Sequence, residues 1–207
     1  YALGTGAHGA QPERGNNALT ALLSALAALP LEDGPSARTI RGLAGLFPHG
    51  DTQGKALELA CADEISGSLT LNFSVLELDQ MGFSAQFDCR FPLCAQEKAL
   101  LSRLSAALSP LGAEVTDPGL VPPHCVPEDD PFVQTLLGVY HDYTGQSARC
   151  LAIGGGTYVH DIPGGVAFGC AMPGVDNRMH EPDEFAILDD LVLSAKMFAQ
   201  VILDVCG

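Results

Sequence analysis

Two stretches of the chain alternate strictly between apolar and polar residues. The odd-numbered positions are apolar in both residues 69–75 and residues 83–89, and the even-numbered positions between them are polar. Successive side chains of a β-strand point to opposite faces, so a period of two predicts a strand with one buried face. The short segment 79–82, DQMG, separates the stretches and has turn composition. We therefore predict two half-buried antiparallel strands joined by a tight turn.

Three other segments in the first half have helical spacing. Leucines recur on one face of residues 17–29, and Pro30 ends that pattern; residues 37–46 and 96–108 show similar apolar spacing. Residues 1–10 and 112–116 read as short strands. Taken in order, the main elements form a β-α-β-β-α-β unit, which is the ferredoxin-like arrangement.

The second half has a different pattern. Asp130 and Pro131 open a predicted helix that Gly145 ends, residues 148–153 and 165–169 read as short apolar strands, and a last helix is expected to begin near Asp183. Its apolar stripe is expected to be Leu188, Leu191, Ala195, Phe198, Ile202 and Val205. Two strands and two helices make a poor domain alone, so this half resembles one edge of a larger α/β layer.

The halves meet in residues 116–131, a segment that contains five prolines and several acidic residues. We predict one domain over residues 1–117 and a second over residues 118–207. The chain does not begin with Met, and its opening residues read as the middle of a strand. We expect it to be part of a longer protein.

Charge and cysteine content restrict the classes of function and the cellular compartment that we expect for the chain. The net charge is −15, from 25 acidic and 10 basic residues, and such a field repels phosphate backbones, which argues against nucleic-acid binding. No apolar run is long enough to span a membrane. The seven cysteines include no CxxC pair, which suits a reducing compartment, so we expect a cytoplasmic protein.

Two segments carry candidate chemistry in the second half. Gly154, Gly155 and Gly156 follow an apolar run and precede Thr157; consecutive glycines let a backbone approach a ligand closely, although an ordinary strand exit has the same pattern. His180 lies in the acidic segment MHEPDE, a setting that suits a zinc ligand and equally a solvated histidine before a helix. One histidine cannot complete a zinc site, which needs about four ligands.

Two further candidates lie in the first half. His8 lies in the segment GAHGA, where it either points into a cleft or lies in a surface loop. Arg90 is the last residue on the polar face of its strand. A guanidinium suits bidentate binding of a carboxylate, and a solvated sheet face is the alternative.

These segments occur in an order that resembles the zinc aminoacylase, carboxypeptidase and dipeptidase superfamily, in particular the PepV-type, carnosinase-like bacterial dipeptidases. The resemblance covers essentially the whole chain and rests on the segments AHGAQPERGNNA, FDCRFP, HCVPEDDPFVQTLLGVYHDYTG, AIGGGTY and MHEPDEF. It implies an α+β chain: a ferredoxin-like lid domain, followed by the C-terminal portion of an α/β zinc-peptidase catalytic domain.

The resemblance also implies roles for single residues. His180 would bind one of two zinc ions, His8 would stabilise the oxyanion of the tetrahedral intermediate, and Arg90 would hold the C-terminal carboxylate of a dipeptide substrate. Gly154, Gly155, Gly156 and Thr157 would line the substrate pocket. The family's other metal ligands and its glutamate base precede the lid and have no match here, so we expect the isolated chain to be inactive. His160 and Asp161 receive no role.

Other interpretations stay open at this stage. The first half could be a non-catalytic ferredoxin-like module for ligand binding or dimerisation, and lid domains of this superfamily often pair, so a homodimer is possible. A deacylase or an aminopeptidase of the same superfamily is a further alternative, although Arg90 favours a substrate with a free carboxylate.

Overall fold

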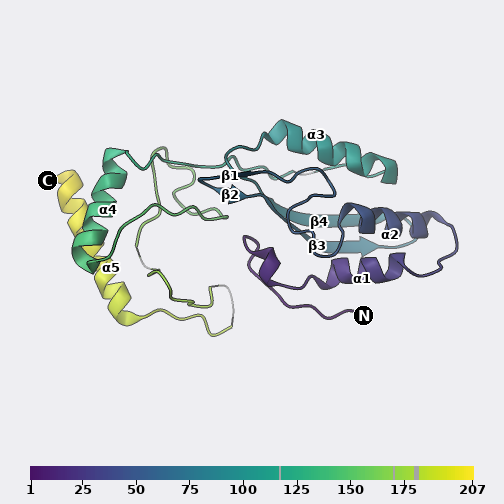
Figure 1. The fold of residues 1–207 in the computed structure, drawn as a ribbon, viewed down its shortest axis with the longest axis horizontal. Helices are drawn as coiled ribbons and strands as arrows, with labels where there is room; N and C mark the ends of the chain where they lie inside the picture. Colours follow the sequence, from purple (N-terminus) through teal and green to yellow (C-terminus); the bar gives the residue numbers. More distant parts are fainter. Residues whose placement is uncertain (117, 170, 180–181) are drawn as a thin grey trace. The chain divides into compact units, whose positions relative to one another are not determined.

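The computed structural model describes residues 1–116, 118–169, 171–179 and 182–207. These residues divide into two compact units, which are described separately below (Figure 1). The first unit comprises Tyr1–Pro123 together with Ala152–Gly155, and the second comprises His124–Leu151 together with Gly156–Gly207. The chain therefore first passes from one unit to the other within the proline-rich segment, and it returns briefly to the first unit at Ala152–Gly155.

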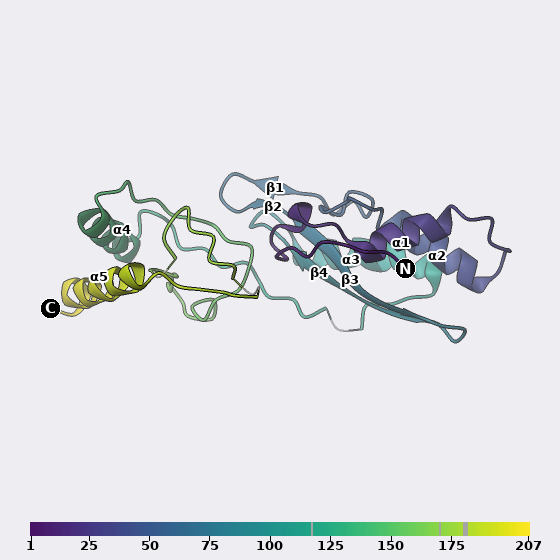
Figure 2. The ribbon, with the colours of Figure 1, turned by 90° about the horizontal axis from the view of Figure 1, so that it is seen from below.

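The two alternating stretches form the antiparallel hairpin at the centre of the first unit. Strand β3 (Thr70–Leu78) pairs with β4 (Phe83–Arg90), and the turn between them closes with a hydrogen bond from the Asp79 N–H to the Gly82 carbonyl at 3.0 Å. Figure 2 shows this long hairpin and its turn. The sequence prediction of two paired strands is confirmed.

A β-bulge at Ser74 changes which face the second half of β3 presents. Phe73 pairs with Phe87, but the next paired residue is Val75, opposite Gln86. The extra residue shifts the alternation by one position. Val75 is consequently 42% exposed, and Leu76 instead packs against the core. The prediction that Val75 shares the buried face of Phe73 is wrong for this reason.

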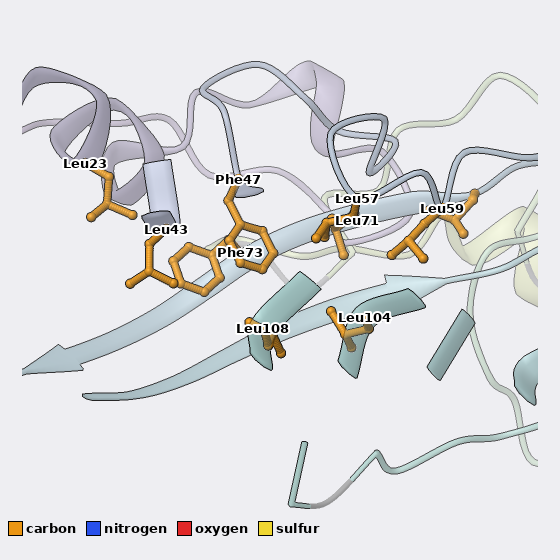
Figure 3. Packing of buried hydrophobic residues seen from close by; sticks show 10 residues of the cluster. Leu23, Leu43, Phe47, Leu57, Leu59, Leu71, Phe73, Leu104 and Leu108 are labelled. Carbon is orange, nitrogen blue, oxygen red and sulfur yellow. The ribbon is translucent and has the colours of Figure 1, made fainter. Parts of the chain in front are cut away.

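Helices cover the apolar face of the hairpin. Helices α1 (Ala18–Ala27) and α2 (Pro35–Leu46) lie side by side, and α3 (Glu97–Leu108) is followed by the short η2 (Ser109–Leu111). Figure 3 shows the side chains that meet between them. The buried members of this cluster are Leu23, Leu43, Phe47, Leu57, Leu59, Leu69, Leu71, Phe73, Leu104 and Leu108.

The two strands predicted at the ends of the first unit do not form. Residues 1–10 contribute only an isolated bridge between Thr5 and Asn16, and residues 113–116 have no regular structure. A small hairpin of β1 (Ala62–Asp63) and β2 (Gly67–Ser68) is present instead. The described residues thus contain two two-stranded sheets, and the ferredoxin-like arrangement stays a prediction.

The β1–β2 hairpin is organised around one carboxylate. The Asp63 side chain accepts hydrogen bonds from the N–H groups of Ile65 (2.9 Å), Ser66 (2.6 Å) and Cys94 (3.1 Å), and from the Ser66 hydroxyl (2.8 Å). These donors, Ser66 first among them, lower the pKa of Asp63 from 3.8 to about 2.

This lowered pKa predicts an acid-sensitive element. A carboxyl whose pKa is lower in the folded state stabilises the fold above its unfolded pKa, and the contribution is lost as the pH falls through the folded pKa of about 2. We expect the melting temperature of the chain to fall between pH 5 and pH 2 by less in Asp63→Asn than in the wild type, measured by circular dichroism. Equal falls in the two proteins would contradict this role.

The second unit is built on two helices. Helix α4 (Pro131–Thr144) begins at its Asp130 cap and ends at Gly145, as predicted, and it packs against α5 (Leu188–Cys206). Its small core contains Leu136, Val139, Met197 and Val201. No strand forms at residues 148–153 or 165–169, so the two strands predicted there are absent from the described structure.

Helix α5 differs from the prediction in its start and in its buried face. Asp183 has a φ of 62°, a left-handed conformation that no helix interior adopts, and the helix begins at Leu188. The predicted apolar stripe is largely exposed; Ile202, for example, is 61% exposed. The face that packs against α4 carries Met197 and Val201 instead. Helix α5 is therefore apolar on two faces, and α4 covers one of them.

No helix among the described residues is long and apolar enough to cross a membrane.

Candidate functional site

His8 lies in a closed loop at the start of the first unit. Thr5 and Asn16 exchange two backbone hydrogen bonds, at 3.0 Å and 2.8 Å, and so join the two ends of the loop. The loop contains the short helix η1 (Pro12–Arg14). The loop also contacts β3 of the hairpin through η1.

Two local hydrogen bonds orient the histidine. The Gln11 N–H donates to the His8 carbonyl at 2.8 Å, and the Ala10 N–H donates to the imidazole Nδ1 at 3.3 Å. Because Nδ1 accepts, the neutral ring carries its proton on Nε2. His8 is therefore held as a donor at Nε2, which is the polarity that stabilisation of an oxyanion requires.

The residue after His8 packs directly on the polar face of the hairpin. The Thr70 hydroxyl donates to the Gly9 carbonyl at 3.3 Å. A Cβ at position 9 would lie 2.7 Å from Nη2 of Arg90 and 2.8 Å from Oδ2 of Asp88. A side chain at position 9 would displace one of these groups, so glycine allows the His8 loop to approach the ion pair.

Arg90 is held side-on by Asp88. The Arg90 Nη2 lies 2.9 Å from Oδ2 of Asp88, and Nε lies 3.2 Å from Oδ1. The two side chains are 28% and 40% exposed, so the pair is partly shielded from water. A bidentate pair fixes the plane of the guanidinium. The end of the guanidinium that carries Nη1 and the second Nη2 hydrogen points away from Asp88.

The glycine turn meets the same guanidinium. The Nη1 group of Arg90 donates a hydrogen bond to the Gly154 carbonyl. A Cβ on Gly154 would lie 2.9 Å from Cβ of Ala10, and one on Gly155 would lie 3.0 Å from Nη1 of Arg90. The structure therefore brings together three of the predicted segments: the His8 loop, Arg90 and the first two glycines of the turn.

Asp88 is the residue that the sequence prediction missed. It occupies the same polar face as Arg90, two positions earlier in β4, and pairs with Asn72 of β3. The alternation already placed both charges on one face, which was a usable signal. Asn72 in turn accepts a hydrogen bond from the Asn17 side chain at 2.9 Å, so the start of α1 is fixed to the same face.

Gly156 and Thr157 belong to the second unit and are exposed. The Thr157 carbonyl accepts a hydrogen bond from the His160 N–H at 3.0 Å, which closes a turn. Their role in a substrate pocket stays a prediction.

His180, the predicted metal ligand, lies outside the described residues. The residues on either side of it meet: the Phe185 N–H donates to the Asn177 carbonyl at 3.2 Å, and Arg178 pairs with Asp183 at 3.8 Å. In the part of the chain that the structure describes, no group of three or more His, Cys, Asp or Glu residues could hold a metal ion. These residues therefore do not fit a zinc site on their own.

His160, which the sequence left without a role, has a structural setting in the second unit. Its ring centre lies 5.6 Å from that of His124, and a ring nitrogen of His124 lies 2.6 Å from the Gly165 carbonyl. These contacts connect the start of the second unit to the loop that follows the glycine turn.

Comparisons with known proteins identify relatives over nearly the whole chain. It is 36% identical over 202 residues to "Putative dipeptidase YtjP" of Bacillus subtilis (strain 168), covering 97% of this chain and 42% of that protein. It is 33% identical over 203 residues to "Beta-Ala-Xaa dipeptidase" of Lactobacillus delbrueckii subsp. lactis, covering 98% of this chain and 43% of that protein. No family model matches the chain.

The chain is thus similar to proteins named as dipeptidases, and it spans about two fifths of the length of the curated relatives it matches. This finding agrees with the coarser part of the resemblance drawn from the motifs.

Proposed function

We propose that this chain forms a substrate-binding part of a dipeptidase, in which Arg90 holds the free C-terminal carboxylate of the substrate. The observation that carries the proposal is the meeting of the His8 loop, the Asp88–Arg90 pair and Gly154–Gly155 in one place. The similarity to proteins named as dipeptidases supports the same class of substrate.

Asp88 prepares the guanidinium for this task. The Asp88 carboxylate accepts hydrogen bonds from Nε and from one N–H of Nη2. The donors of Arg90 that Asp88 does not bind therefore lie at the far end of the guanidinium, on Nη1 and Nη2. A substrate carboxylate that approaches this end accepts hydrogen bonds from Nη1 and Nη2. It replaces the Gly154 carbonyl as the acceptor at Nη1. Because the guanidinium is already oriented, little side-chain entropy is lost when the substrate binds.

His8 supplies the second function of the site. When water adds to the peptide carbonyl, negative charge develops on its oxygen, and a donor placed there stabilises the transition state. In our proposal the Nε2–H of His8 is that donor, and the Ala10 N–H maintains the required tautomer through Nδ1. We also propose that Gly156 and Thr157 bind the substrate through backbone groups, as the resemblance of the motifs implies.

We further propose that the complete dipeptidase is zinc-dependent and that His180 is one of its metal ligands. The resemblance of the motifs supports this, and the other ligands would come from outside the described residues, which do not contain a set of donors for zinc. It follows that the isolated chain should not hydrolyse dipeptides.

The direct test compares substrates that differ only at the C-terminus. The full-length gene product is assayed with zinc, manganese or cobalt against dipeptides and against the same dipeptides as C-terminal amides. We expect hydrolysis of the free acids with kcat/KM about 100-fold above the amides, because the amides lose the charge-assisted bonds to Arg90. Failure to hydrolyse any dipeptide would overturn the proposal, as would equal rates for acids and amides.

A further inference from the structure

The β1–β2 hairpin is joined to the loop that follows β4 in the first unit. The Cys94 N–H donates to Oδ2 of Asp63 at 3.1 Å, and the Leu93 N–H donates to the Ser66 hydroxyl at 2.9 Å. Cys61 immediately precedes β1, and its carbonyl accepts the Leu69 N–H at 2.9 Å. Two segments that are remote in sequence therefore lie side by side, with one cysteine on each.

The two thiols lie close to each other. Cys94 is near enough to Cys61 to contribute to the raised pKa of the Cys61 thiol, and both are free thiols. Cys94 is exposed, whereas Cys61 is half-buried and packs against the first hydrophobic cluster. Neighbouring thiols on two segments that hydrogen bonds hold together are suitable for a disulfide, because little backbone movement is then needed to join them.

We propose that Cys61 and Cys94 are a modification site that forms a reversible disulfide when the protein meets a peroxide. Neither the site nor its test depends on the proposed dipeptidase activity.

The oxidation takes place in two balanced steps. The exposed Cys94 thiolate attacks one oxygen of hydrogen peroxide, the O–O bond breaks, and Cys94 becomes a sulfenic acid while hydroxide leaves and takes a proton to become water. The Cys61 thiol then loses its proton, its sulfur attacks Sγ of Cys94, and hydroxide leaves as a second water. Two thiols have been oxidised by two electrons, and one peroxide has been reduced.

Burial indicates which of the two cysteines reacts first with the peroxide, and it argues against Cys89 as the reactive thiol. Burial raises the pKa of the Cys61 thiol, with the nearby Cys94 thiol as a further cause, and burial raises the pKa of Cys89 to about 11. Since the thiolate is the reactive form, these two react slowly with a dissolved oxidant. Cys61 can still resolve the sulfenic acid because the hydrogen bonds to Asp63 and Ser66 hold the Cys94 segment beside its own.

The disulfide would close a covalent loop around most of the central sheet. The loop runs from Cys61 to Cys94 and contains all four strands, β1 to β4, including Arg90 at the end of β4. A cross-link over such a segment restricts the unfolded chain more than the folded one. Oxidation should therefore raise the melting temperature of the first unit by roughly 5 °C or more.

Peptide mapping tests the pairing on the chain itself. Trypsin cleaves after Lys55, Arg90 and Lys98, so Cys61 and Cys94 fall in the peptides 56–90 and 91–98. After treatment with hydrogen peroxide we expect these two peptides to be linked, with a mass 2 Da below their sum, and dithiothreitol to separate them. Cys89 shares the peptide 56–90, so the mapping is repeated in Cys89→Ser, which should keep the link.

Matched variants complete the experiment. Cys61→Ser and Cys94→Ser should each lose the linked peptides and the rise in melting temperature, whereas Cys206→Ser, at an exposed cysteine of the second unit, should lose neither. The proposal is overturned if Cys89→Ser abolishes the link, if the wild type forms disulfide-linked dimers instead, or if Cys94 stops at a sulfenic or sulfinic acid.

Discussion

Replacing Phe73 by alanine should destabilise the first unit by about 3–5 kcal/mol, the usual range for removal of a buried phenylalanine. Phe73 is 3% exposed and lies in the middle of the main cluster. Its ring stacks on that of Phe47, with centroids 4.2 Å apart and planes 9° apart. Figure 3 shows both side chains in the cluster. The substitution removes this stack and leaves a cavity between the hairpin and the helices.

Native-state hydrogen exchange is the appropriate measurement, because two units need not unfold together. The tyrosines lie mostly in the second unit, at positions 140, 143 and 158, so tyrosine fluorescence would report on the wrong part of the chain. Peptides from β3 and β4 give the opening free energy of the first unit, and peptides from α4 and α5 are an internal control that should change little.

Val75→Ala is the matched control, and it also tests the bulge. Val75 is 42% exposed, so its truncation should cost less than about 1 kcal/mol. Strict alternation would instead place Val75 beside Phe73 on the buried face, and the cost would then approach that of a core residue. Similar losses for the two variants would contradict the register of the hairpin.

A periodic pattern of apolar residues is sufficient to predict those elements that depend on local effects. The β3–β4 hairpin and helices α1 to α4 follow from apolar spacing and from caps such as Asn17 and Asp130, because these are local effects. The bulge at Ser74 has no comparable signal. Both Val75 and Leu76 are apolar, so the sequence does not show which of them continues the buried face.

In the second half of the chain, apolar composition alone did not predict strands correctly. The runs 148–153 and 165–169 have the composition of strands, but a strand also needs a neighbour to pair its backbone groups, and the described residues supply none. Leu151 and Ile153 are accordingly 67% and 66% exposed. In α5, apolar residues cover two faces, and spacing alone could not predict which face would pack against α4.

The candidate site was predictable in its parts but not in its arrangement. His8, Arg90 and the glycines lie in separate motifs of the sequence, and only the fold shows that Gly9 and Gly154 approach the same guanidinium. The role of Asp88 follows from geometry, because its two oxygens meet Nε and Nη2 of Arg90. His180 lies outside the described residues, so its assignment to a metal site still rests on the motif.

Arg90→Met in the full-length gene product should lower kcat/KM for free dipeptides by about 100-fold. The variant loses two charge-assisted hydrogen bonds to the substrate carboxylate, together worth about 3 kcal/mol, and every 1.4 kcal/mol is a factor of ten. The loss should appear chiefly in KM if the carboxylate interaction is equally strong in the ground state and the transition state. Steady-state kinetics on a free dipeptide measures it.

The amidated dipeptide is the control substrate in this experiment. It has no carboxylate for Arg90 to bind, so Arg90→Met should change its kcat/KM by no more than a few-fold. A 100-fold loss on both substrates would show that Arg90 supports the fold or the loop of His8 and does not recognise the carboxylate. Circular dichroism of the variant identifies a general loss of structure.

Two milder substitutions, one at Arg90 and one at Asp88, separate the charge of the guanidinium from its orientation. Arg90→Lys keeps the positive charge but loses the planar fork, so it should retain part of the preference for the free acid and lose roughly tenfold in kcat/KM.

Asp88→Asn keeps the size of the side chain but weakens the pair that orients the guanidinium, because the Asp88 oxygens lie 2.9 and 3.2 Å from Arg90. Its KM for the free dipeptide should rise a few-fold while KM for the amide stays unchanged. An equal rise for both substrates would mean that Asp88 acts on the stability of the strand, whereas a selective rise shows that orientation of Arg90 contributes to recognition.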